Sequence, residues 1–157
     1  MKKILAFVAL ICLIGISGCT PVEEGIYKEG TYYGTATDNY GGETNTATAI
    51  VYVDASGVIK SVTLDTTYVK DGVVTTKKSL GNEYGMKGVS ASKGTIAGGA
   101  EWFEQVANLE KKIVSEQGLD WLVWSDTDKT VTDSVSGVTI KINALVEAAN
   151  NAINQAK

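Results

Sequence analysis

Residues 46–53 read TATAIVYV, a run in which the character of the side chains alternates with a period of two. In an extended chain, one face of this run would carry the smaller apolar residues Ala47, Ala49, Val51 and Val53. The opposite face would carry Thr48, Ile50 and Tyr52, so we expect both faces to be partly covered. This alternation, with many β-branched residues, is typical of a β-strand.

Further strand signals lie on both sides of this run. Residues 31–37 and 58–64 alternate in the same way, and residues 66–69 are joined to residues 73–76 across Lys70-Asp71-Gly72. The Asp-Gly pair is typical of a tight hairpin. We therefore predict that the first half of the chain forms an antiparallel β-meander.

The second half has helical periodicity in two places. Residues 100–117 place Trp102, Val106, Leu109 and Ile113 on one face, and a second helix is predicted for residues 140–155. We predict an α+β fold, in which these two main helices pack on the meander sheet as a single domain over residues 31–157. Between sheet and helices, residues 80–99 contain six glycines, and we interpret them as an irregular binding loop, with disorder as the alternative.

The N-terminus has the pattern of an export signal. Two lysines precede the apolar run 4–16, which is too short to span a bilayer and ends in Ile16-Ser17-Gly18-Cys19. This ending looks like a lipobox, so we predict a signal peptide at residues 1–18, lipidation of Cys19 with acyl chains such as palmitate, and a tether over residues 19–30. The protein would then be anchored at the extracytoplasmic face of the cell membrane. An ordinary secretory signal or an uncleaved anchor is the alternative.

Composition excludes several kinds of chemistry. The chain has no His, all 14 of its basic residues are Lys, and its two cysteines are Cys12 in the signal and Cys19. Disulfides, thiolate metal sites, haem ligation and Ser-His-Asp catalysis are therefore excluded for the mature domain, and we predict no metal site. Without residues 1–18 the formal charge is near −6, which disfavours nucleic acid as a partner. A redox or transfer function would need a cofactor.

Residues 133–139 read DSVSGVT. This segment resembles the flavinylation motif D-x-x-S-G-A-T of FMN-binding domain proteins. The resemblance implies that a flavin transferase joins the phosphate of FMN to Thr139, and that Asp133, Ser136 and Gly137 belong to the pattern that the transferase recognises. Val138 departs from the usual alanine.

The position of Thr139 also has a reading that does not depend on the family. If the last helix begins at residue 140, Thr139 lies at its N-terminus, where unpaired N–H groups and the helix dipole stabilise a phosphate. Gly137 would let the backbone come close to that phosphate. The alternative is that Thr139 is a simple N-cap.

The resemblance covers nearly all of the mature chain, beginning with residues 30–34 and 53–62. Residues 80–87, LGNEYGMK, followed by residues 101–105, EWFEQ, are similar to lipoproteins of flavin-based extracellular electron transfer. The likeness to the membrane-spanning subunits of Rnf and sodium-pumping quinone reductases, whose loop reads E-T-P-G-L-G, is weaker.

The pair Gly85-Met86 takes the place of the Gly-Leu in that loop. We therefore expect Tyr84 and Met86 to pack on the isoalloxazine ring, with ordinary loop packing as the alternative. Trp102 is expected in the core. Trp121 and Trp124 either flank the flavin or cap the sheet.

The resemblance implies an electron carrier rather than an enzyme. Covalent FMN would accept electrons from a membrane quinol-linked dehydrogenase and pass them to another carrier or an external acceptor. Two alternatives stay open at this level. One is a lipid-anchored ligand-binding or adhesion module without a cofactor, and the other is a structural lipoprotein that has lost its cofactor, at which the departure of Val138 hints.

Overall fold

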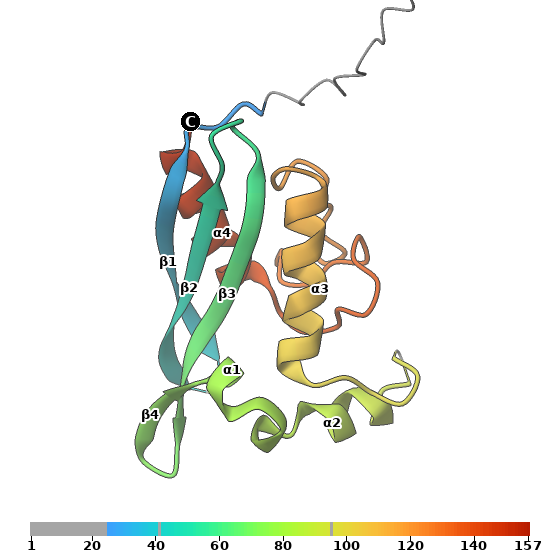
Figure 1. The fold of residues 1–157 in the computed structure, drawn as a ribbon. Coiled ribbons are helices and arrows are strands. Elements are labelled where there is room, and N and C mark those ends of the chain that lie inside the picture. Colours follow the sequence, from blue (N-terminus) through green and yellow to red (C-terminus); the bar gives the residue numbers. More distant parts are fainter. Residues whose placement is uncertain (1–24, 41, 95) are drawn as a thin grey trace, which may run out of the picture.

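The computed structural model describes residues 25–40, 42–94 and 96–157 (Figure 1). The predicted signal peptide and the predicted lipidation site at Cys19 lie outside the described residues. Among the described residues, no helix has the length and apolar character needed to cross a bilayer.

Four strands form one antiparallel sheet in the order β1-β2-β3-β4, as a meander. They are β1 (Gly30–Tyr40), β2 (Glu43–Val53), β3 (Ile59–Lys70) and β4 (Val73–Thr76). Our two predicted segments 58–64 and 66–69 are one strand, because β2 continues to pair with β3 through Asp65. At the β3–β4 hairpin, Asp71 and Gly72 both have positive φ angles, of 52° and 79°, as a tight two-residue turn requires.

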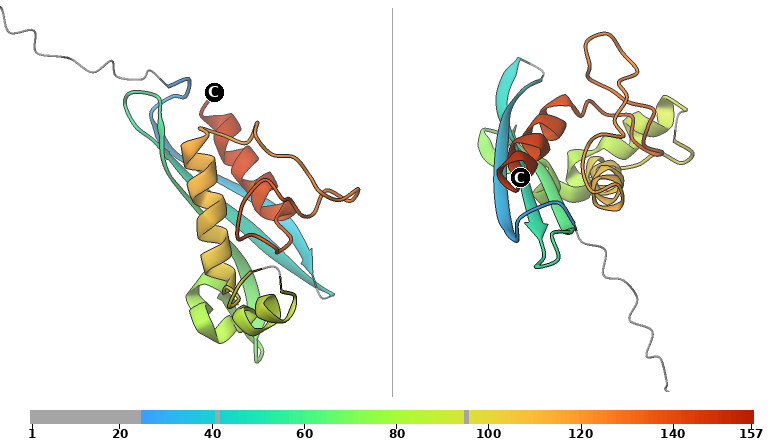
Figure 2. Two further views of the ribbon diagram at one scale, coloured as in Figure 1. Left: turned by 90° about the vertical axis from the view of Figure 1, so that its right-hand side faces the viewer. Right: turned by 90° about the horizontal axis from the view of Figure 1, so that it is seen from above.

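Two long helices cover one face of this sheet. Helix α3 (Trp102–Ser115) packs on β3, and α4 (Asn143–Gln155) packs on β1 and β2, so that the helices lie side by side (Figure 2). The core between the layers is built from small and branched side chains, among them those of Ala49, Val51, Leu64, Val106, Leu109, Ala149 and Ile153. The predicted α+β architecture is confirmed.

The other face of the sheet is open. Tyr33, Ile50 and Tyr52 are 57%, 46% and 43% exposed, and they lie on neighbouring strands. Our expectation that both faces of β2 are partly covered is therefore wrong. Both long helices lie on the same side of the sheet, and none is left over for the outer side.

Residues 80–99 are more ordered than predicted. They include the last residue of α1 (Lys77–Leu80), the 3-10 helix η1 (Gly81–Tyr84) and α2 (Met86–Ser92). Polar contacts with distant parts of the chain stabilise this region: Met86 N–H donates to Glu101, and Ser90 exchanges hydrogen bonds with Ala100. These helices were not predicted from the sequence because the segment contains six glycines, and glycine is a poor helix former.

The last helix begins three residues later than predicted, at Asn143. The N–H of Ile142 donates to the carbonyl O of Thr130 at 2.8 Å, and φ of Ile142 is −121°. The chain just before α4 is therefore held by the preceding loop and does not continue the helix.

The chain from residue 25 is docked on the domain. Gly25 and Tyr27 donate backbone hydrogen bonds to Ser56 and Gly57 in the β2–β3 turn, and Lys28 donates to Ala156 at the end of α4. The hydroxyl of Tyr27 also donates to Gln117 O. Residues 25–30, which we assigned to the tether, thus belong to the folded domain, with Gly30 as the first residue of β1.

Candidate functional site

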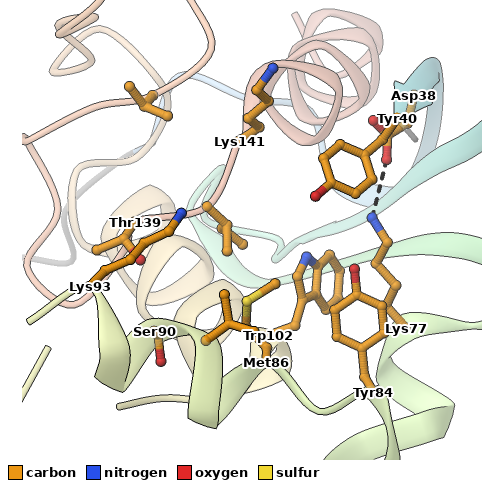
Figure 3. A pocket seen from close by; sticks show the side chains of 13 residues that line it. Asp38, Tyr40, Lys77, Tyr84, Met86, Ser90, Lys93, Trp102, Thr139 and Lys141 are labelled. Carbon is orange, nitrogen blue, oxygen red and sulfur yellow. Dashed lines mark hydrogen bonds and ion pairs between the residues drawn. The ribbon is translucent and has the colours of Figure 1, made fainter. Parts of the chain in front are cut away.

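A pocket of about 250 Å³ opens where the end of β1, the α1–α2 region, the start of α3 and residues 131–141 meet (Figure 3). Three of the residues predicted to meet FMN line it, namely Tyr84, Met86 and Thr139. They come from two segments that lie far apart in the sequence. The fold brings these segments together by packing α2 and the loop before α4 around the N-terminal end of α3.

Thr139 is half-buried at one side of this pocket. Its N–H and its hydroxyl both donate to Oε1 of Gln105, at 2.9 and 3.2 Å. Gln105 is fully buried in α3, and its Nε2 donates to Ala100 O at 3.2 Å. Thr139 is thus held by one buried amide that is itself fixed.

This geometry corrects both readings of Thr139 as a helix residue. The N-cap of α4 is Ile142, so Thr139 lies neither at the first turn nor at the cap. The predicted stabilisation of a phosphate by the dipole of this helix is wrong, because that effect falls off within about one turn. The simple N-cap role is equally wrong.

The hydroxyl of Thr139 can be esterified without leaving a buried group unpaired. Esterification would remove the hydroxyl proton that Gln105 accepts, but Oε1 of Gln105 would keep the Thr139 N–H at 2.9 Å. An unpaired buried acceptor would cost about 1–3 kcal/mol. The hydrogen bonding around Thr139 is therefore compatible with a phosphoester at this hydroxyl.

Tyr84 and Met86 are placed by the glycine between them. Gly85 has φ 78°, a left-handed conformation that ends η1 and starts α2. The ring of Tyr84 packs edge-on against Trp102, with the ring centroids 6.4 Å apart. Trp102 is buried in the core, as predicted, and also lines the pocket.

Lys77 is one of the site residues that sequence reasoning missed. It follows β4 directly, is only 6% exposed, and its Nζ lies 3.3 Å from Oδ2 of Asp38. The same Nζ lies over the rings of Tyr40, Tyr84 and Trp102, at 5.7, 5.8 and 5.4 Å from their centroids. No local pattern marks it, since its carboxylate partner is 39 positions away.

The pocket has positive character. Lys93 and Lys141 line it together with Lys77, against the single carboxylate of Asp38. Burial raises the pKa of Tyr84 to about 12, with smaller contributions from Tyr68, Tyr40 and Asp38.

Comparison with known proteins adds evidence about the fold. No family model and no curated protein matches the chain. A solution NMR structure of a Clostridium thermocellum protein, from a structural genomics consortium, matches with a TM-score of 0.52 and 30% identity. The match covers 82% of this chain and 91% of that one. The chain belongs to the same family as that protein.

The other residues of the segment 133–139 do not line the pocket. Asp133 and Ser136 are exposed, and Gly137 turns the chain at φ 76° beside Asn108. Val138 is 6% exposed and packs in the core. The structure thus brings Thr139 together with Tyr84 and Met86, while Asp133 and Ser136 lie on the accessible side of the loop.

The two tryptophans left open by the sequence lie elsewhere. Trp121 and Trp124 are partly buried against the core, and neither lines the pocket. The indole Nε1–H of Trp121 donates to Gly118 O. In the described part of the chain, no three His, Cys, Asp or Glu side chains are grouped so that they could hold a metal ion.

Proposed function

We propose that this protein is an electron carrier whose FMN is joined through a phosphoester to Thr139. The observation that carries the proposal is that Thr139 lines the same pocket as Tyr84 and Met86. A flavin phosphate at Thr139 and a flavin ring against the aromatic wall would then belong to one site. FMN would supply the transfer of one or two electrons, for which this chain has no group of its own.

The size of the pocket supports a ring system held inside it and a chain leading out to Thr139. Pockets that enclose a whole drug-sized ligand have volumes of about 300–1,000 Å³, and this one has about 250 Å³. Tyr84, Met86 and Trp102 would hold the ring, since aromatic faces and a thioether pack well on a flat surface.

The loop before Thr139 is suited to recognition by a flavin transferase. Asp133 and Ser136 are exposed, so an enzyme could reach them without unfolding the domain. Val138, the departure from the motif, points into the core and not toward such an enzyme. This burial supports modification of Thr139 in spite of the departure from the motif.

The remaining parts of the proposal concern location and partners. Lipid anchored at Cys19, the protein would lie at the extracytoplasmic face of the cell membrane. It would take electrons from a quinol-linked dehydrogenase and deliver them to a carrier or an external acceptor. A covalent bond keeps the cofactor from being lost by dilution outside the cell.

The test is to express the chain together with an active flavin transferase and to measure the intact mass and in-gel flavin fluorescence. We expect a mass gain of one FMN less water in the wild type and none in Thr139→Ala. Thr127→Ala changes an exposed threonine of the same irregular segment and should load normally. A colourless wild-type protein with no added mass would contradict the proposal and favour a binding module without a cofactor.

A further inference from the structure

Lys77 is an unusual residue to find at the edge of a pocket. Lysine is seldom fully buried unless it is paired, because removing an ammonium from water is costly. Here the residue is 6% exposed, and its ammonium has the Asp38 carboxylate as a partner at 3.3 Å. The same ammonium lies over the faces of Tyr40, Tyr84 and Trp102, which do not hydrate the positive charge as water would.

This ammonium lies across the pocket from the proposed attachment point. In Figure 3, Thr139 and Lys93 lie on one side, Lys77, Tyr40 and Tyr84 lie on the other, and Met86 and Trp102 lie between them. A ligand attached at Thr139 and packed on Met86 and Trp102 would therefore extend toward Lys77. The Lys77–Asp38 pair would meet the far edge of its ring system.

We propose that Lys77 and Asp38 set the reduction potential of this site in opposite directions, with Lys77 favouring the reduced flavin and Asp38 opposing it. This inference rests on the proposed function. Uptake of two electrons and one proton adds one negative charge to the ring system. A positive charge beside the ring stabilises that added charge and a carboxylate destabilises it, and both effects are stronger in a partly buried pocket than in water.

The inference is tested by the midpoint potential of the flavin-loaded protein. Dithionite supplies the electrons, the buffer supplies the proton, and a reference dye reports the potential under anaerobic conditions. For Lys77→Met we expect the reduced form to be disfavoured at least tenfold, a downward shift of about 30 mV for a two-electron couple. For Asp38→Asn we expect a shift of similar size upward.

Two matched variants separate charge from packing. Lys77→Arg keeps the positive charge and should stay near the wild-type potential, even if its thermal stability falls. Lys28→Gln removes an exposed lysine at the opposite end of the domain and should change nothing. A purely structural role for the pair would lower stability in both pocket variants without shifting the potential in opposite directions.

The outcomes separate this inference from the proposed function. If the wild type gains no FMN, the proposed function fails, and the inference fails with it. If all variants carry FMN and have equal potentials, the inference alone is overturned. If Lys77→Met does not fold, Asp38→Asn decides the matter, and an unchanged or lowered potential there overturns the inference.

Discussion

At the scale of single residues, the site depends on side chains that are buried and polar. Gln105 is fully buried in α3, yet its amide oxygen accepts both hydrogen bonds by which Thr139 is held. A buried polar residue on the core face of an amphipathic helix interrupts the apolar stripe. Burying the amide of Gln105 costs free energy, and its hydrogen bonds with Thr139 and Ala100 offset that cost.

Replacement of Gln105 should therefore weaken both the fold and the attachment site. In Gln105→Met the volume is kept but the Thr139 N–H loses its acceptor, and we expect a loss of about 2 kcal/mol in the free energy of unfolding. Gln105→Ala adds a cavity and should lose more. Urea denaturation measures the stability, and flavin loading by the transferase should slow in both variants. Stability and loading equal to wild type in Gln105→Met would show that this amide does not position Thr139.

At the scale of elements, local patterns predicted the sheet and the two long helices well. Period-two alternation marks β2, the Asp-Gly pair marks the β3–β4 hairpin, and the apolar stripe marks α3. Helix α2 was missed because its order comes from Glu101 and Ser90 contacts and not from helix propensity. Contacts of this kind produce no periodic pattern of apolar residues, so the helix could not be predicted from periodicity.

The same limit applies to the site. The motif and the Gly85-Met86 pair drew attention to Thr139, Tyr84 and Met86, which do line one pocket. Lys77, Asp38 and Gln105 were not predicted to contribute, since each acts through a partner far along the chain. Their roles become visible only when the packing of α1, β1 and α3 is known.

Close packing of α4 on β1 yields a prediction at this scale. A Cβ on Gly34 would collide with the carbonyl O of Ala148 and the backbone N of Ala152. Backbone atoms cannot move aside cheaply, so Gly34→Ala should separate helix from strand and cost more than about 3 kcal/mol.

The matched control for Gly34 is Gly88→Ala. Gly88 lies within α2, and a Cβ there would meet no atom within 4 Å. Alanine at such a helical position should stabilise by about 0.5–1 kcal/mol. Thermal unfolding of the two variants side by side compares the effects, and equal stability of Gly34→Ala and wild type would contradict the packing of α4 on β1.

At the scale of the whole molecule, the pocket and the N-terminal end of the domain lie at opposite ends of the sheet. Gly25 and Tyr27 pair with the β2–β3 turn, whereas Tyr40 and Lys77 line the pocket at the far end of β1 and after β4 (Figure 1). Lys77 follows Thr76, which pairs with Thr67 of β3, so the stretch of β3 from Ile59 to Thr67 separates the β2–β3 turn from Lys77 by about 26 Å, at about 3.3 Å per residue. An anchor at Cys19 would thus direct the pocket away from the membrane.

This orientation can be measured, because the domain after Cys19 contains no other cysteine. Single cysteines introduced as Ala55→Cys at the anchored end and Val73→Cys at the pocket end, both exposed, accept a donor fluorophore while the lipid occupies Cys19. With acceptor-labelled headgroups in anionic vesicles, we expect strong energy transfer at position 55 and weak transfer at position 73. Residues 20–24 reach at most about 20 Å, and the formal charge near −6 repels an anionic surface, so the domain should stand upright. Equal transfer from both positions would mean that the domain lies on its side, with the pocket at the lipid surface and no room for a large soluble acceptor to approach it.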